Sequence, residues 1–565
     1  MPAFLQNISR YFALVLATVF ALAFVYLVLA NRWPGPFVDY WIDMPLVQHY
    51  LQSGQLDLHE LVVAHNNAHR ILVPRLLFVA DFAWFQGTNV LLVAVSFLCK
   101  ILTLWLFISL LKQQGLVRDA WLLALVVITV FHASNVGNVV HNSNIQWDLV
   151  SLFALLALHF YYRAVQQQRS GGNFLLAWLF FSAAFFSHAG SLSLLPVFLL
   201  MSLVHRRWWQ VLTTLALALL ALYLTFVLLP QREPDELTYD SAVAMLLFKP
   251  LAVMAYVFKF FSITLAQFLG AWGLYFSAAV LIGLLGAITH FVRSRGHNDH
   301  PFFYFALFLL LMTITIAASR VDFSAKTWWA VRYQTTALLL LLSVTLYLVL
   351  LSRQYGSWLK HIALAHALLM LCLAQLFTYK DGFVGSNKVL AAHAQLLTFG
   401  ANQQNGAAIL PSLQAVDRIA QVDDLFLSKG LAYYSNKVSL DSAQPLSFKR
   451  PGAALLAPME RSAFAGQCRP HRQTLHLQTR SQGDGYEFIS ALDTQHDSFL
   501  RAMLNRHTYY ALDEQGAVQG FAYLYAVPEQ HYLQAQIRGY SLSPNIRYLA
   551  EIRGQKPYCL YSLAF

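Results

Sequence analysis

Eleven long apolar runs constrain the fold of this chain more than any other feature. A helix needs about 20 predominantly apolar residues to cross a membrane, with about 17 as the usual lower limit. Runs of this kind, or nearly so, occur at 11–30, 89–111, 120–137, 147–164, 173–188, 191–205, 210–229, 270–292, 301–319, 334–352 and 360–379. The two short runs that flank Ser187-His188-Ala189-Gly190 are predicted to form a helical pair joined by a tight turn. The fold class we predict is a polytopic α-helical membrane protein with about 11 transmembrane helices.

The composition of the 565 residues excludes an ordinary soluble enzyme. Hydrophobic residues make up 58 % and charged residues 12 %, whereas a soluble globular chain has about 45–50 % apolar and about 25 % charged residues. The mean hydropathy is +0.51. A net charge of +11 would suit a nucleic-acid partner, but much of the excess lies in short loops between apolar runs, where a bilayer explains it. We therefore expect membrane lipids, and no nucleic acid, as partners.

Charged residues are unevenly distributed along the chain. Residues 1–379 contain 34 of them, and the remaining 186 residues contain 31. This contrast predicts a transmembrane module at 1–379, a helical linker at 380–430 and a β-rich domain at 431–565, either α+β or similar to a β-sandwich. Within the last domain, Asp513-Glu514-Gln515-Gly516 is typical of a hairpin turn.

The loop charges predict the orientation. One set of loops carries eleven basic residues and only two acids, Asp119 and Asp299, and the positive-inside rule places this set in the cytoplasm. The N-terminus is then cytoplasmic, and the C-terminal domain is periplasmic if the membrane is a bacterial inner membrane. In that oxidising compartment we expect a disulfide between Cys468 and Cys559, with two buried thiols as the alternative.

Two apolar stretches are not assigned as spans. Residues 71–86 carry Arg75 and Asp81, and residues 241–266 carry two lysines and a proline. Charges are costly at the centre of a bilayer. We expect both stretches to form helices that lie at the outer membrane surface.

Polar residues gather in the outer loops. Polar residues of the first outer loop include Asp39, Asp43, Asp57, Glu60, His65, His69 and Arg70. Later loops add His141, Asn142, His188, Arg320, Lys326, Arg332 and Tyr333. A carboxylate can deprotonate a hydroxyl nucleophile, and the planar donor fork of arginine suits a phosphate. Together they would suit a reaction whose leaving group is a lipid phosphate.

This layout resembles the GT-C superfamily of membrane glycosyltransferases, which includes the lipid A aminoarabinose transferase and the protein O-mannosyltransferases. The resemblance covers residues 1–379 by the order of its elements. Four local matches carry it, namely DYWIDMPLVQHYLQSG beginning at Asp39, HNNAHRILVPRLLFVADFAWFQGTN, the short pair FFSHAGSLSLLPVFLLMSLVHRRWW, and Arg332-Tyr333 at the start of a late span.

The resemblance implies an inverting enzyme that moves a sugar from a polyprenyl-phosphate donor to a periplasmic glycan, lipid or protein. Asp39 is then the general base, with Asp43 as the alternative. The expected ligands of the donor phosphate are Arg332, Arg70, Lys326 and Arg320. The expected sugar or acceptor contacts are His65, His69, Tyr333, Asn142, His141 and His188.

The chain also departs from the family pattern. Tyr40 follows Asp39 where the family often has a second acid, and HNNAHR contains no glutamate. His65 and His69 have the i, i+4 spacing of a helical metal pair, but no third ligand is evident nearby. We therefore assign no metal site, and a divalent metal is left without support.

Other interpretations of the same residues stay open. Asp39 could cap a helix, Arg332 could anchor the chain at the lipid headgroups, and Asn142 could cap the following span. For the whole chain, the rival functions are a transporter or flippase of a lipid-linked sugar, a non-catalytic subunit of envelope polysaccharide assembly, and a polysaccharide polymerase or ligase. A transporter would place polar residues in the middle of the bilayer.

Overall fold

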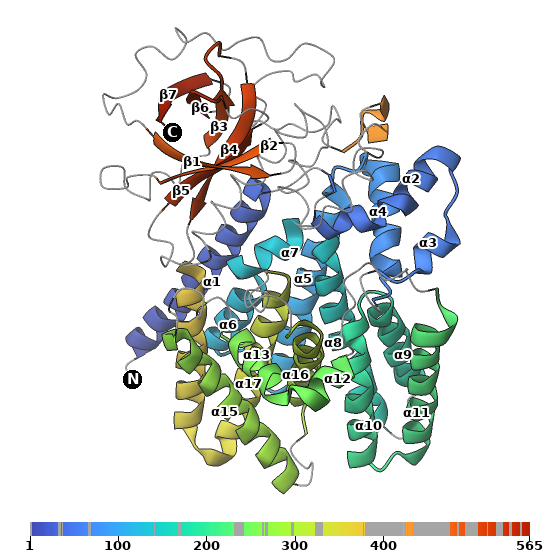
Figure 1. Ribbon diagram of the computed structural model, residues 1–565. Helices are drawn as coiled ribbons and strands as arrows, with labels where there is room; N and C mark the ends of the chain where they lie inside the picture. The colour runs from blue at the N-terminus through green and yellow to red at the C-terminus, as the bar shows by residue number, and fades with distance from the viewer. Residues whose placement is uncertain are drawn as a thin grey trace. The chain divides into compact units, whose positions relative to one another are not determined.

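Figure 1 shows the computed structural model of the chain. The described residues are 3–31, 35–36, 38–65, 69–140, 142–167, 171–230, 242–262, 265, 269, 271–294, 299–321, 331–376, 378, 422, 425–426, 428–432, 475–482, 485–491, 507–516, 518–526, 535–541, 545–553 and 556–564. Contacts between residues divide the chain into two compact units. Unit 1 comprises Met1–Val28, Ser53–Val79 and Leu92–Thr378, and unit 2 comprises Leu29–Gln52, Ala80–Leu91 and Tyr379–Phe565.

Unit 1 is helical. Its α-helices, of which α1, α4 and α5 each have one end in unit 2, are α1 (Ala3–Asn31), α3 (Leu58–Val62), α4 (Leu72–Phe85), α5 (Val90–Gln113), α6 (Ala120–Val130), α7 (Val136–Val140), α8 (Ile145–Gln166), α9 (Gly171–Phe185), α10 (Leu194–Val204), α11 (Trp208–Tyr223), α12 (Ala242–Phe248), α13 (Pro250–Phe260), α15 (Ala271–Arg293), α16 (Pro301–Arg320) and α17 (Gln334–Tyr355). A further helix spans Ser357–Leu376. Single helical turns are η2 (Ala133–Asn135), η3 (Asn142–Asn144), η4 (Ala189–Ser193), η5 (Leu224–Leu228) and η6 (Val331–Tyr333).

Eight helices of the described chain are long and apolar enough to cross a membrane. They are Phe4–Leu29, Val90–Gln113, Ala120–Val140, Ile145–Gln166, Trp272–Arg293, Pro301–Arg320, Gln334–Tyr355 and Ser357–Leu376. The prediction of a multi-pass helical membrane protein is confirmed.

The remaining three predicted spans are shorter than expected. They correspond to α9, α10 and α11, of 15, 11 and 16 residues. At 1.5 Å per residue, α9 and α10 reach only about 23 Å and 17 Å, less than the roughly 30 Å of a hydrocarbon core, and α11 reaches about 24 Å before it continues into η5. The count of about eleven full-length spans therefore exceeds the eight that meet the length, because apolar composition alone does not fix where a helix ends.

Helix α17 lies at the centre of unit 1, with 89 % of its most apolar stretch buried. It packs against α6, α8, α15 and α16 (Figure 1). Peripheral helices instead expose large apolar side chains, such as Leu22 on α1 and Leu212 on α11. Exposed apolar side chains of this kind fit a lipid environment, because acyl chains are as apolar as leucine. The first turn of α17, which begins at Gln334, is therefore buried within unit 1.

Helix α4 corresponds to the predicted non-spanning stretch 71–86, and it is 14 residues long. Its two charged residues are fully buried. Arg75 donates from Nη1 to the carbonyl oxygens of Leu61 at 3.2 Å and Val63 at 2.5 Å. Asp81 accepts from the backbone N–H groups of Asn89 at 2.8 Å and Leu91 at 2.9 Å, where α5 begins. Both charges therefore bond to backbone groups.

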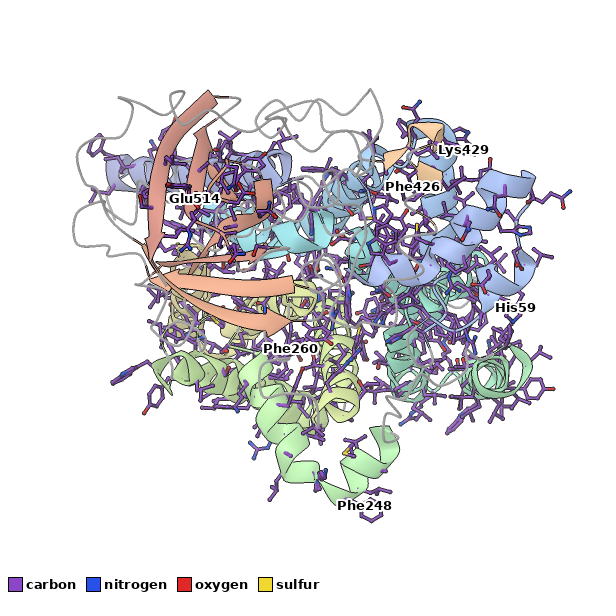
Figure 2. All side chains as sticks on the ribbon, turned by 45° about the horizontal axis from the view of Figure 1, so that its top comes forward. His59, Phe248, Phe260, Phe426, Lys429 and Glu514 are labelled. Carbon is purple, nitrogen blue, oxygen red and sulfur yellow. The ribbon has the colours of Figure 1, made fainter. Side chains whose placement is uncertain are left out.

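The second non-spanning stretch forms two short helices. The helices α12 and α13 are separated at Lys249, which Pro250 follows as the first residue of α13. A proline at this position starts a helix readily but cannot continue one. Neither helix is long enough to cross a bilayer. Phe248 and Leu251 are more than 80 % exposed, and Figure 2 shows Phe248 pointing away from its helix. Their place at the outer membrane surface stays a prediction.

Unit 2 contains η1 (Val38–Asp43), α2 (Met44–Ser53) and a β-barrel. The strands are β1 (Leu475–Gln482), β2 (Gly485–Ala491), β3 (His507–Leu512), β4 (Val518–Ala526), β5 (Ala535–Ser541), β6 (Tyr548–Arg553) and β7 (Lys556–Ala564). Their order is β1-β2-β5-β4-β3-β6-β7, and a parallel contact between β1 and β7 closes the barrel. The other pairs are antiparallel.

The predicted hairpin turn joins β3 to β4. Asp513 accepts the N–H of Gln515 at its Oδ1 atom at 3.0 Å, and Gly516 has φ +84°, a conformation that glycine adopts without strain. The β-rich C-terminal region is confirmed, but its described strands close into a barrel and do not form two stacked sheets. Cys468, the side chain of Cys559 and most of the predicted linker 380–430 lie outside the described residues. The predicted domain boundaries stay predictions.

Candidate functional site

Arg332 and Tyr333 lie immediately before the first residue of α17. The preceding turn η6 (Val331–Tyr333) leads directly into α17. Asn138 of α7 donates from Nδ2 to the carbonyl oxygen of Arg332 at 3.2 Å and to Oγ1 of Thr335 at 2.7 Å. Thr335 in turn donates to Oδ1 of Asn135 at 2.8 Å. The backbone of Arg332 is therefore held by side chains from a neighbouring segment.

The turn between α9 and α10 holds His188. Its Nδ1 atom accepts the N–H of Gly190 at 2.9 Å, so in the neutral ring the proton is on Nε2. A Cβ atom at Gly190 would lie 2.9 Å from this Nδ1 and 3.0 Å from Cγ of Met312. Glycine is needed here because α16 approaches the turn closely. The predicted helical pair with a tight polar turn is confirmed.

Four aromatic rings from four segments meet beside this turn. The ring of His188 lies 4.3 Å from the ring of His69 and 4.3 Å from that of Trp147, between centroids. Trp147 contacts Tyr333 edge-on at 5.3 Å. The Cζ atom of Arg332 lies 5.3 Å from the centroid of the Tyr333 ring. We call these residues, together with Arg320 at the end of α16, the aromatic–arginine cluster.

The electrostatics of the cluster favour neutral histidines and a bound anion. Burial, aided by His65, Arg320 and Arg332, lowers the pKa of His188 to about 3. Burial is also the main cause that lowers the pKa of His69 well below its usual value, and nearby His188, His65, Arg320 and Arg332 add to it. Both imidazoles are therefore uncharged at neutral pH, and the positive charge of the cluster comes from the two guanidinium groups.

Two buried polar atoms of the cluster have no hydrogen-bond partner among the described residues. They are Nδ1 of His69 and Nε1 of Trp147. A buried polar atom left in this state costs about 1–3 kcal/mol. A ligand with hydroxyl or phosphate oxygens would satisfy both. Two guanidinium groups, an indole N–H and neutral imidazoles are suited to an anionic, hydroxyl-rich ligand.

The cluster unites five of the residues selected from the sequence, namely Arg332, Arg320, His69, His188 and Tyr333. His65 is buried nearby, and its N–H donates to the carbonyl oxygen of His69 at 2.8 Å. His141, Lys326 and the side chain of Asn142 lie outside the described residues. Within the described part of the chain, no group of three histidine, cysteine or acidic residues could hold a metal ion.

Arg70 has a different environment from the one predicted. It is 1 % exposed, and its guanidinium donates to carbonyl oxygens in and just after η5, namely those of Pro230, of Thr225 at 2.8 Å and of Leu229 at 3.4 Å. It also donates to the carbonyl of Val62 at 3.2 Å. The last carbonyls of a helix lack internal partners and attract a cation. Arg70 therefore fixes the backbone, and we do not carry it into the phosphate site.

The two acids selected as bases belong to η1 in unit 2. Asp43 is 1 % exposed, and the side chain of Asp39 lies outside the described residues. A 3₁₀-helix has three residues per turn, so positions 39 and 43 are about 120° apart and do not share a face, as they would in an α-helix. Burial raises the pKa of Tyr40 well above its usual value, with Asp81 and Asp43 adding to the effect. The carboxylates of Asp81 and Asp43 therefore both lie near the hydroxyl of Tyr40.

A buried ion pair joins α5 to α8. Nζ of Lys100 lies 3.0 Å from Oδ1 of Asp148, and the two side chains are 4 % and 2 % exposed. Both also line a cavity of about 20 Å³ with Asn135 and Thr335, which has room for one water molecule. In the sequence, Lys100 lies within the apolar run 89–111 and Asp148 lies at the start of the run 147–164. A lone lysine in an apolar span needs a partner, and that was the available signal.

Trp147 is the other residue that sequence reasoning missed. It stands at the start of the apolar run 147–164, and hydropathy gave no sign that its ring would contact both His188 and Tyr333. Comparisons of the chain with protein-family models, with curated proteins and with solved structures find no match.

Proposed function

We propose that the chain is a membrane glycosyltransferase of the GT-C type that uses a polyprenyl-phosphate-linked sugar. The observation that carries this proposal is the aromatic–arginine cluster, in which Arg320 and Arg332 lie within electrostatic reach of His69 and His188. Two permanent cations suit a phosphate, and the indole and imidazole groups suit a sugar. The cluster combines residues that the resemblance had assigned to phosphate and to sugar.

The proposed reaction is an inverting transfer. An acceptor hydroxyl loses its proton to the carboxylate of Asp39, or of Asp43, and its oxygen attacks the anomeric carbon of the donor sugar. The bond between that carbon and the phosphate oxygen breaks, and both bonding electrons leave with the lipid phosphate. Arg332 and Arg320 stabilise the negative charge that develops there. No nucleotide is required.

The proposal includes a location. Transfer takes place at the periplasmic face of a bacterial inner membrane, with a cytoplasmic N-terminus. The acceptor is a glycan, a lipid or a protein, and recognition of it is the role proposed for the C-terminal barrel. The support is the distribution of basic residues among the loops.

The test measures release of polyprenyl phosphate. Purified wild-type protein is incubated with native membrane lipid extract that contains polyprenyl-phosphate sugars, and the released lipid phosphate is quantified by mass spectrometry. Asp39→Asn keeps the shape of the side chain and removes the base, so release should fall by about 10²–10⁴-fold. Asp43→Asn decides which of the two acids acts.

Asp57→Asn is the matched control. Asp57 caps α3 by accepting the N–H groups of His59 at 2.9 Å and Glu60 at 3.2 Å, and asparagine caps a helix almost as well. This variant should release lipid phosphate like the wild type. Equal release by the wild type and by both the Asp39 and Asp43 variants would contradict the assigned base.

The Lys100–Asp148 pair favours a second candidate function. Buried ionisable residues in membrane helices often mark transport pathways, and the pair matches what the transporter alternative predicts. A transporter of a lipid-linked sugar would move the intact donor between the leaflets of a proteoliposome and release no polyprenyl phosphate. Transfer of the donor without release would replace the glycosyltransferase proposal.

A further inference from the structure

A groove of about 620 Å³ opens between α15, α17 and the helix Ser357–Leu376. On α17 its lining extends from Leu341 to Tyr355, the last residue of the helix. The aromatic–arginine cluster lies at the first turn of α17. The groove and the cluster therefore belong to opposite ends of this central helix, and the proposed reaction does not use the groove.

Small residues of α15 form one wall of the groove. Ala279, Gly283 and Gly286 line it, and Arg293 lines its end. Their spacing of four, three and seven residues places them along one face of the helix. A Cβ atom at Gly286 would meet no other atom within 4 Å, whereas one at Gly283 would lie 3.1 Å from Cδ1 of Leu348. The missing side chain at Gly286 therefore leaves open space.

The charge of the groove is concentrated at one end. Arg293 is exposed there and has no ion pair among the described residues. Beside it, Nδ1 of His290 and the hydroxyl of Tyr355 form a hydrogen bond of 2.8 Å. No acidic side chain is among the lining residues in the described part of the chain. The other polar lining residues are Thr289, Thr345 and His366, and the rest of the lining is apolar.

We propose that this groove binds an anionic glycerophospholipid, with one acyl chain along α15 and the phosphate on Arg293. The positive end complements an anionic headgroup. The volume is within the usual range of ligand pockets, about 300–1,000 Å³.

The length of the groove also favours a phospholipid. From Ala279 to Arg293 the helix rises about 21 Å. This is longer than the roughly 15 Å of one leaflet's hydrocarbon and shorter than the roughly 30 Å of the whole core. A lipid of a single leaflet fits that length when its glycerol and phosphate, which lie beyond the hydrocarbon, are included, whereas a long polyprenyl chain would not be contained in it.

Native mass spectrometry of the full chain in mild detergent tests the site. The probes are phosphatidylglycerol, phosphatidylcholine and a polyprenyl phosphate, each added separately at equal concentration. The wild type should bind phosphatidylglycerol about five-fold more than phosphatidylcholine, as one charged contact allows. Arg293→Gln should abolish this preference. Arg118→Gln, which changes an exposed arginine between α5 and α6 that is not part of the groove, should keep it.

Gly286→Leu should remove most of the bound phosphatidylglycerol, because the new side chain fills the open space. Leucine is a better helix former than glycine, so α15 should still fold. Gly172→Leu is the matched control, since a Cβ at that position in α9 also meets nothing within 4 Å. Unchanged lipid binding in Gly286→Leu would overturn the proposal. The proposal would also be overturned if the wild type bound polyprenyl phosphate more than phosphatidylglycerol and Gly286→Leu removed that binding. A wild-type dimer that Gly286→Leu dissociates would overturn it as well.

Discussion

The imidazole of His188 accepts a hydrogen bond from the N–H of Gly190 through Nδ1 and is 2 % exposed. Its low pKa of about 3 follows mainly from burial, with nearby His65, Arg320 and Arg332 adding to the effect. In the unfolded chain a histidine has a pKa near 6.5. Between these two values the unfolded state binds a proton that the folded state does not, so the free energy of unfolding must fall as the pH falls.

Acidification should therefore destabilise the wild type more than His188→Asn. Asparagine retains a capping acceptor for Gly190 but does not titrate. The expected loss for the wild type is up to about 1.4 kcal/mol per pH unit below pH 6.5. The measurement is the thermal midpoint in detergent from pH 7.5 to pH 4.5. Parallel profiles for the two proteins would show that His188 is not buried as a neutral ring.

At the scale of elements, the turn between α9 and α10 depends on Gly190. A Cβ atom there would lie within 3.0 Å of both His188 and Met312. Gly190→Ala should lower the free energy of unfolding by about 1–3 kcal/mol, the usual effect of overpacking. Gly172→Ala, in open space in the first turn of α9, should be neutral or stabilising. Denaturant titration of both variants checks this, and equal stabilities would contradict the close packing of the turn.

The Lys100–Asp148 pair predicts a strongly non-additive pair of substitutions between α5 and α8. Lys100→Met leaves a carboxylate buried without its cation, which should cost about 3–5 kcal/mol of stability. Adding Asp148→Leu removes that charge and should recover most of the loss. The coupling is measured by unfolding the two single variants and the double variant in mixed micelles.

The same variants separate the two candidate functions. In the glycosyltransferase account the pair only supports the fold, so the double variant should still release polyprenyl phosphate. A double variant that folds stably but no longer moves the intact lipid-linked sugar between the leaflets of a proteoliposome would favour the transporter account.

The elements that were predictable from sequence are those set by local patterns. The apolar runs, the polar turn before Gly190 and the non-spanning stretch around Arg75 and Asp81 all follow from hydropathy and turn chemistry. The partners of charged residues were not predictable. Arg70 bonds to Thr225 and Pro230, and Lys100 pairs with Asp148. Such contacts depend on how helices that are distant in the sequence pack together. A single sequence does not show which residues of two such helices face each other.

At the scale of the whole molecule, the sequence predicted a helical membrane module and a β-rich C-terminal region, and the structure contains both. Closure of the strands into a barrel was not foreseen, because it depends on the parallel contact between β1 and β7. Residues nearly 90 positions apart form that contact, and no local pattern encodes it. Most residues of the aromatic–arginine cluster were selected from the sequence as candidate site residues, but Trp147 was not.

The predicted topology can be tested on the intact chain. Alkaline phosphatase fused after Phe565 should be active, because this enzyme folds only in an oxidising compartment such as the periplasm. The same reporter fused within the basic loop between α5 and α6, near Arg118, should be inactive. The reverse pattern would place the aromatic–arginine cluster on the cytoplasmic side and contradict the proposed location.

The central claim is that the aromatic–arginine cluster binds the phosphate of a polyprenyl lipid. The most direct measurement is the Kd of a short-chain polyprenyl phosphate for the wild type, Arg332→Gln and the control Arg118→Gln. Loss of one charge-assisted hydrogen-bonding group costs about 1.5–3 kcal/mol, so Arg332→Gln should weaken binding by about 10–100-fold, and Arg118→Gln should bind like the wild type. Equal affinity in all three proteins would contradict the assignment of the phosphate site.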